Sequence, residues 1–255
     1  MPPSNYLHMT DDELDKPVFR IIPIHRLLEC FQKKQLILVP PQKWDDPFEN
    51  LLLSAKVTLA NGETGITQPI WDKVYGQCWT LHKETDAMWR IYSANKNGAK
   101  IKSTPRKLLE ALKASDPQFA DIHCYIGKVE YIERQKDLVS TLKDIDLFNI
   151  NGSGIAESLM YKRYEFKHEK EVRLIYIGQS KDIHPFAIDP NTIFDEVIFD
   201  PRMDAELYEA YKAAVKAKGF TNRIDQSVLY RLPRDLQTQL NEANGVRQQT
   251  KKIDM

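Results

Sequence analysis

The spacing of apolar positions along the chain changes between the alternation typical of strands and the longer period typical of helices. Short runs rich in β-branched and aromatic residues predict strands, and apolar residues that recur on one face predict amphipathic helices. The predicted strands cover residues 17–22, 36–39, 76–81, 99–103, 124–132, 172–177, 187–193, 196–200 and 224–232. The predicted helices cover residues 24–34, 86–92, 104–114, 134–147, 155–161 and 201–218.

The order of these elements indicates an α+β protein. Strands and helices follow one another irregularly, without repeated strand–helix–strand units, so we expect one mixed or antiparallel sheet with flanking helices. The 255 residues, 42% of them hydrophobic, suffice for one large domain. We expect a flexible polar arm over residues 1–16, a single α+β domain over residues 17–232, and a frayed polar tail over residues 233–255.

The charge balance argues against strong non-specific attraction to nucleic acid. Lys and Arg together number 36, as do Asp and Glu, so the formal net charge is zero and no global basic field surrounds the protein. A local basic groove stays open as an alternative. The first residues carry no apolar signal segment, and no run reaches the length of a membrane span. We therefore expect a cytoplasmic protein without membrane contact.

Familiar catalytic motifs are missing from the sequence. Neither a GxGxxG nor a GxxxxGKS/T phosphate loop is present, and neither HExxH nor GxSxG occurs. The three cysteines stand far apart, and the histidines show no ligand spacing. The sequence therefore predicts no catalytic metal and no disulfide framework.

The densest group of charged residues lies in residues 161–176, YKRYEFKHEKEVRLIY. If the strand that follows begins early, Glu169, Glu171 and Arg173 share one face of it. Adjacent carboxylates repel, so one pKa should rise on burial, while cations such as Lys162 would hold them ionised. Two interpretations stay open: a Glu pair that grips a ribose hydroxyl and stabilises a cationic sugar, or a solvated edge strand with ion pairs.

Three other segments are candidates for the same site. Arg20 lies between two apolar residues of the first strand, so it faces either solvent or an anion. Thr80 ends the segment Cys-Trp-Thr, and the Cys78 thiol in this apolar strand is more often a core residue than a nucleophile. Trp89, Arg90 and Tyr92 fall within four positions, and an aromatic ring beside a guanidinium suits a nucleotide. The alternative is a core pair of the two aromatics with a solvated Arg90.

Three motifs resemble a large, mostly uncharacterised bacterial family that often occurs among phage-defence genes. They are the Asp46–Glu49 loop (DPFE), the segment 88–93 (MWRIYS) followed by 97–101 (NGAKI), and the segment 166–173 (FKHEKEVR). The resemblance covers most of the chain between the first strand and residue 202. This resemblance assigns the chain to a type of domain but implies no particular activity.

The layout also resembles that of ADP-ribosyltransferases, which place an Arg or His on the first strand, Ser-Thr-Ser on a second element, and Glu-x-Glu on a later strand. Arg20 matches the first position, and Glu169 and Glu171 match the third. Thr80 matches the second only in part, because Cys-Trp-Thr stands where Ser-Thr-Ser would be. The fold implied is a split, mixed β core with flanking helices, and the substrate implied is NAD.

This second resemblance implies roles for individual residues. Glu171 would bind the ribose 2′-hydroxyl and stabilise the oxocarbenium-like state, and Glu169 would orient or deprotonate the acceptor. Arg20 or Arg90 would hold the pyrophosphate. Trp89 or Tyr92 would make the contact that the incomplete middle motif leaves open.

The leading hypothesis is therefore an NAD-dependent ADP-ribosyltransferase-like enzyme, the toxic effector of a phage-defence or toxin–antitoxin system. Its acceptor would be protein, RNA or DNA, and an antitoxin or chaperone would contact the polar tail. A second hypothesis is a non-catalytic module that senses a nucleotide or a phage component. A third is a metal-independent nuclease that uses Glu169, Glu171, His168 and nearby cations.

Overall fold

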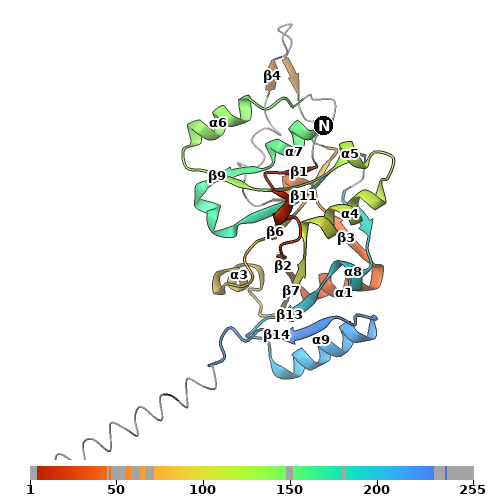
Figure 1. Cartoon of the computed structure of the whole chain (residues 1–255). Helices are drawn as coiled ribbons and strands as arrows, with labels where there is room; N and C mark the ends of the chain where they lie inside the picture. The colour runs from red at the N-terminus through yellow and green to blue at the C-terminus, as the bar shows by residue number, and fades with distance from the viewer. Residues whose placement is uncertain are drawn as a thin grey trace, which may run out of the picture.

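The structure is a computed structural model that describes residues 5–44, 46, 56–58, 64–66, 72–147, 152–179, 182–232 and 239. Its centre is an eight-stranded mixed sheet with the strand order β1-β8-β11-β6-β2-β7-β13-β14 (Figure 1). These strands are β1 (Tyr6–Leu7), β2 (Val18–Pro23), β6 (Val74–Thr80), β7 (Gly98–Ser103), β8 (Cys124–Lys128), β11 (Glu171–Ile177), β13 (Glu196–Phe199) and β14 (Arg223–Gln226). The predicted α+β class with a mixed sheet and flanking helices is confirmed.

Smaller strand pairs and helices surround this sheet. The pairs combine β10 (Tyr161–Arg163) with β9 (Glu130–Ile132), β12 (His184–Ala187) with β3 (Gln35–Leu38), and β4 (Lys56–Thr58) with β5 (Thr64–Ile66). The α-helices are α1 (Ile24–Lys33), α3 (Asp86–Tyr92), α4 (Pro105–Ser115), α5 (Ala120–His123), α6 (Gln135–Lys143), α7 (Ser153–Ser158), α8 (Pro190–Ile193) and α9 (Ala205–Ala217). The 3-10 helices are η1 (Asp11–Glu13), η2 (Pro41–Lys43) and η4 (Tyr164–Glu169).

Apolar faces of the helices close the core against the sheet. Helices α1 and α4 lie on one side of the sheet and α3 on the other (Figure 1). The main core includes Leu27 of α1 and Leu108 and Leu112 of α4, each fully buried. A smaller core forms where α7 packs under the sheet, around Tyr125 and Ile175.

The sheet is split between β2 and β6. Strand β2 pairs antiparallel with β7 over its whole length, but it pairs with β6 only at Phe19 and Thr80. Beyond this pair the two strands diverge, so backbone hydrogen bonds do not close the gap between the two halves of the sheet. Any polar side chain there faces a space that other side chains or a ligand must fill.

The N-terminal segment differs from the predicted flexible arm. Strand β1 pairs in parallel with β8 at the sheet edge, and Leu14 is buried. The Asn5 side-chain amide donates to the carbonyl oxygens of Asp121 and Cys124 at 3.0 and 2.8 Å. A polar segment is therefore held by edge pairing and amide hydrogen bonds, which hydropathy does not reveal.

Two other predicted strands are also corrected. The run 124–132 is divided into β8 and β9, and β9 leaves the main sheet to pair with β10. Residues 190–193 form α8, because the Asp189 side chain caps the Asn191 amide and Pro190 fits the first helical turn. No helix in the described part of the chain is long and apolar enough to cross a membrane. The predicted tail over 233–255 lies outside the described residues, Gln239 excepted.

Candidate functional site

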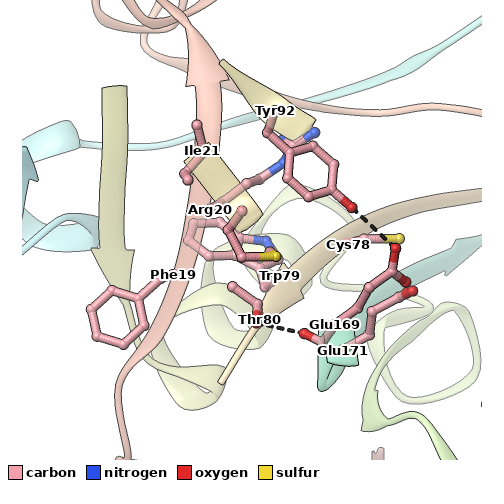
Figure 2. A pocket seen from close by; sticks show the side chains of 10 residues that line it. Phe19, Arg20, Ile21, Cys78, Trp79, Thr80, Tyr92, Glu169 and Glu171 are labelled. Atoms are coloured by element: carbon pink, nitrogen blue, oxygen red, sulfur yellow. Dashed lines mark hydrogen bonds between the residues drawn. The ribbon is translucent and has the colours of Figure 1, made fainter. Parts of the chain in front are cut away.

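A pocket of about 140 Å³ occupies the split between β2 and β6. Strands β2, β6 and β11, helix α3 and the end of η4 all contribute to its wall. Five predicted site residues line it together: Arg20, Thr80, Tyr92, Glu169 and Glu171. Figure 2 shows the two glutamates side by side, with the Tyr92 hydroxyl pointing toward Glu169.

A left-handed turn brings the two glutamates together. Glu171 is the first residue of β11 and pairs with Thr80 of β6, whereas Glu169 is the last residue of η4. Lys170 between them adopts φ 43° and ψ 58°, so the two side chains do not share a strand face as predicted. The Thr80 hydroxyl donates to the Glu169 carbonyl oxygen at 2.6 Å and ties this turn to β6 (Figure 2).

Two cations contact the glutamate pair. Lys162 of β10 places its Nζ 2.6 Å from Glu169 Oε2 and 2.5 Å from Glu171 Oε1. Arg173 of β11 donates from Nε to Glu171 Oε2 at 2.8 Å. The Lys162 and Arg173 side chains are 7% and 0% exposed, so this ion network is nearly dry. The sequence pointed to these cations only through their nearness in the chain.

The two carboxyls have different proton affinities. Burial, together with the hydrogen bond to Glu171, raises the pKa of Glu169 to about 7. Burial also opposes ionisation of Glu171, but the Arg173 charge, the Glu169 hydrogen bond and the Lys162 charge outweigh it and lower its pKa. The pair therefore holds one charge firmly on Glu171 and exchanges a proton near neutral pH mainly at Glu169.

Arg173 is anchored from several sides. Its Nη1 donates to the Leu159 carbonyl oxygen at 2.6 Å, and its guanidinium lies 4.6 Å from the centre of the Trp44 ring. Trp44 is not among the pocket-lining residues. Its ring contacts the Arg173 guanidinium and packs on the smaller core.

Tyr92 stands over Glu169 at the end of α3. Its hydroxyl donates to Glu169 Oε1 at 3.4 Å. Burial, followed by the charges of Glu169 and Glu171, raises the pKa of Tyr92, so it remains a neutral donor. Arg202 fixes this end of the helix by donating to the carbonyl oxygens of Trp89 and Ser93, both at 2.9 Å. No motif or spacing in the sequence pointed to Arg202.

Arg20 is the cation of the opposite wall. Within the described part of the chain no oxygen accepts a hydrogen bond from Arg20 and no carboxylate pairs with it. Its side chain keeps some exposure along the pocket, yet burial lowers the pKa of its guanidinium. The described groups whose electrostatic effect opposes this shift are Cys78, Cys30 and Tyr92, and a thiol or a phenol is ordinarily neutral at pH 7.

The structure does not bring Trp89 and Arg90 to the pocket. Trp89 is fully buried, and its indole N–H donates to Glu84 at 2.8 Å. Arg90 is 65% exposed at its side chain and pairs with Asp86 at 2.7 Å. His168, named for the nuclease hypothesis, is exposed on η4 and does not line the pocket.

The DPFE loop and candidate metal ligands are described only in part. Of the DPFE loop the structure describes Asp46, which is buried and pairs with Arg163 at 2.9 Å; residues 47–49 lie outside the described residues. Among the described residues no group of at least three His, Cys, Asp or Glu side chains could hold a metal ion.

Comparison with known proteins gives one family match and several remote structural ones. A family model described as a protein of unknown function (DUF2971) matches residues 88–174, about a third of the chain. This range includes the segments 88–93 and 166–173 that carry the resemblance to an uncharacterised family. No curated protein matches the chain.

Three of the structural matches are to DarT from Thermus sp. 2.9. The complex with NAD+ is 11% identical, with a TM-score of 0.40, over 84% of this chain and 96% of that one. The complex with ADP-ribosylated ssDNA is 12% identical, with a TM-score of 0.41, over 84% and 94%. The complex with carba-NAD+ has a TM-score of 0.38 at 12% identity, over 84% and 96%. Values this low do not assign an activity.

Proposed function

We propose that the protein is an NAD-dependent ADP-ribosyltransferase whose active site is the pocket in the split sheet. The observation that carries this proposal is the division of charge across the pocket. Arg20 on β2 is a cation without an acceptor among the described residues, whereas Glu169 and Glu171 form a carboxyl pair on the other wall. A ligand with an anionic phosphate and a sugar that becomes cationic during reaction matches both walls.

The chemistry follows from where charge develops. Breaking the bond between nicotinamide and ribose leaves positive charge on the sugar, and a fixed carboxylate stabilises it most where water is excluded. Glu171 is 7% exposed at its side chain and ionised, so it suits this role. Glu169, which exchanges a proton near neutral pH, suits deprotonation of the acceptor. Arg20 would pair with the pyrophosphate.

The pocket size limits which part of the dinucleotide it encloses. One water needs on the order of 10–15 Å³ of cavity volume, so a pocket of about 140 Å³ holds roughly ten non-hydrogen atoms. That is room for the nicotinamide or its ribose, and the rest of NAD would lie outside the pocket. Thr80 and Tyr92, which border the carboxyl pair, would contact the enclosed group.

The test measures nicotinamide release from NAD by the purified protein, with cell lysate as the source of protein, RNA and DNA acceptors. We expect Glu171→Gln to lower the release rate at least a hundredfold, because it removes the placed charge. The matched control is Glu165→Gln, an exposed residue of the same segment, which should retain full activity. Equal release by wild type and Glu171→Gln would refute the proposed role of Glu171.

The same variants test the proposed role as a toxic effector of a defence or toxin–antitoxin system. Expression of the wild type should arrest growth, and Glu171→Gln should relieve the arrest. An antitoxin or chaperone would be expected to suppress the arrest without a change in the protein's abundance. Growth arrest by both the wild type and Glu171→Gln would show that toxicity does not depend on this chemistry.

One observation favours a second candidate, a non-catalytic nucleotide-binding module. Glu171 is already held by Lys162 and Arg173, as in a structural ion network. Such a module would bind NAD through Arg20 with no release of nicotinamide. Calorimetric binding of NAD together with unchanged NAD after prolonged incubation would favour this candidate.

A further inference from the structure

We propose that Lys162 is a positioning residue that bridges the glutamate pair and allows Glu169 to lose its proton next to Glu171, which Arg173 keeps ionised. The inference rests on the proposed function only for its chemical consequence. The assignment itself is a property of the free protein and is tested without catalysis.

The geometry of the three side chains carries this assignment. Lys162 Nζ is a single positive charge shared between Glu169 Oε2 at 2.6 Å and Glu171 Oε1 at 2.5 Å. Glu171 has a second cation, Arg173, at 2.8 Å from its other oxygen. Glu169 has instead the neutral Tyr92 hydroxyl at 3.4 Å. With two cations against one, the negative charge is more stable on Glu171.

Arg20 faces the pair from across the pocket, and two other described neighbours, Tyr131 and Thr80, are not charged. Tyr131 of β9 accepts a hydrogen bond from the Glu171 backbone N–H at 2.9 Å through its hydroxyl, and burial raises its pKa, so it stays neutral. The hydroxyl of Thr80 on β6 donates to the Glu169 carbonyl oxygen and not to a carboxyl group. Of the described cations, Lys162 is thus the one that touches both carboxylates.

Local structure holds Lys162 in place. It lies on β10, in register with Tyr131 of β9, so the strand pair fixes its backbone. Its Nζ lies 4.5 Å from the centre of the Phe166 ring, which adds a cation–π contact. At 7% exposure the ammonium is shielded from water, and its effect on the carboxyls is weakly screened.

The consequence concerns the acceptor. As the bond between ribose C1′ and nicotinamide breaks, its electron pair leaves with nicotinamide. A lone pair of the acceptor forms the new bond to C1′, and the acceptor proton passes to the Glu169 carboxylate and then to solvent. The site therefore suits an acceptor that must lose a proton, a neutral N–H or O–H group.

The direct test is a titration of the Glu169 carboxyl by 13C NMR in the protein without ligand. The Lys162→Met variant removes a cation in direct contact with Glu169, so the titration midpoint of Glu169 should rise by about one pH unit or more. Lys162→Arg keeps the charge and should stay within about half a unit of wild type. The control Lys167→Met removes an exposed cation of η4 and should leave the midpoint unchanged.

An unchanged midpoint in Lys162→Met would overturn the assignment. If that variant fails to fold, Lys162→Gln removes the same charge while its amide still donates to the carboxyls, and the same upward displacement is expected. Thermal unfolding of each variant separates a folding defect from an altered titration.

A second readout links the assignment to activity. The low-pH limb of kcat for nicotinamide release should move upward in Lys162→Met by the same interval as the Glu169 titration, and Lys162→Arg should restore it. A merely structural role would lower the rate at every pH without moving the limb. If the wild type releases no nicotinamide, the proposed function fails, while the NMR titration still decides the role of Lys162.

Discussion

Replacing Arg20 by Met should make the protein more stable and at the same time destroy its ligand binding. The Arg20 guanidinium lines the pocket, and no described residue accepts a hydrogen bond from it. A fully buried polar group left without a partner costs about 1–3 kcal/mol, and the partial exposure of Arg20 along the pocket reduces this cost, while Met keeps a flexible apolar stem of similar length. The free energy of unfolding should therefore rise by about 1 kcal/mol, or roughly 2–4 °C in Tm for a domain of this size.

The assay combines urea unfolding with binding of a non-hydrolysable NAD analogue. At a hundredfold excess over Kd, the analogue should stabilise the wild type by about 2.7 kcal/mol and Arg20→Met hardly at all. The control is Arg26→Met, which removes an exposed pair with Glu29 and should change stability by about 0.5 kcal/mol or less. The reasoning is refuted if Arg20→Met is less stable than the wild type or if it still binds the NAD analogue.

Two further predictions concern packing next to the site and pH dependence. Burial lowers the pKa of His184 to about 4, so the contribution of the neutral imidazole to stability is present above pH 6.5 and is lost as the pH falls toward 4. The His184→Phe variant keeps the stack on Tyr176. Between pH 7 and pH 5 its free energy of unfolding, measured in urea, should fall by about 1–2 kcal/mol less than that of the wild type. An equal loss in both proteins would contradict this. A Cβ at Gly76 would lie 2.6 Å from Trp44 and 3.0 Å from Ile175, so Gly76→Ala should cost about 1–3 kcal/mol; an unchanged Tm would show that the Trp44 ring moves freely.

Local sequence signals located most of the elements that build the site. Helix α3 spans the predicted residues 86–92 because the Thr85 side chain accepts a hydrogen bond from the Met88 amide and caps its first turn. Strand β2 follows from a β-branched run that ends at Pro23. That Arg20 and the two glutamates line the same pocket was predicted from the family resemblance, because their spacing in the sequence does not bring them together.

The side chains that the sequence misplaced depend on tertiary packing. Trp89 and Tyr92 lie three residues apart on α3, yet Trp89 is enclosed by the core while Tyr92 reaches the pocket. Glu169 reaches Glu171 through the left-handed backbone of Lys170, a conformation that a lysine rarely adopts. The contact of Lys162 with both carboxyls requires β10 to pair with β9, and the sequence predicted no strand at β10.

The residue types at the split are explained better by a ligand than by folding. Strands β2 and β6 share one backbone pair, Phe19 with Thr80, so apolar side chains could fill the gap at lower free energy than buried charges do. Instead the chain places Arg20 on one wall, where it has no acceptor among the described residues and costs stability without a ligand, while Lys162 and Arg173 compensate the two carboxyls on the other wall. An anionic phosphate bound at Arg20 would offset the cost on its wall. A purely structural ion network would need the glutamates and their cations, but it would not need Arg20.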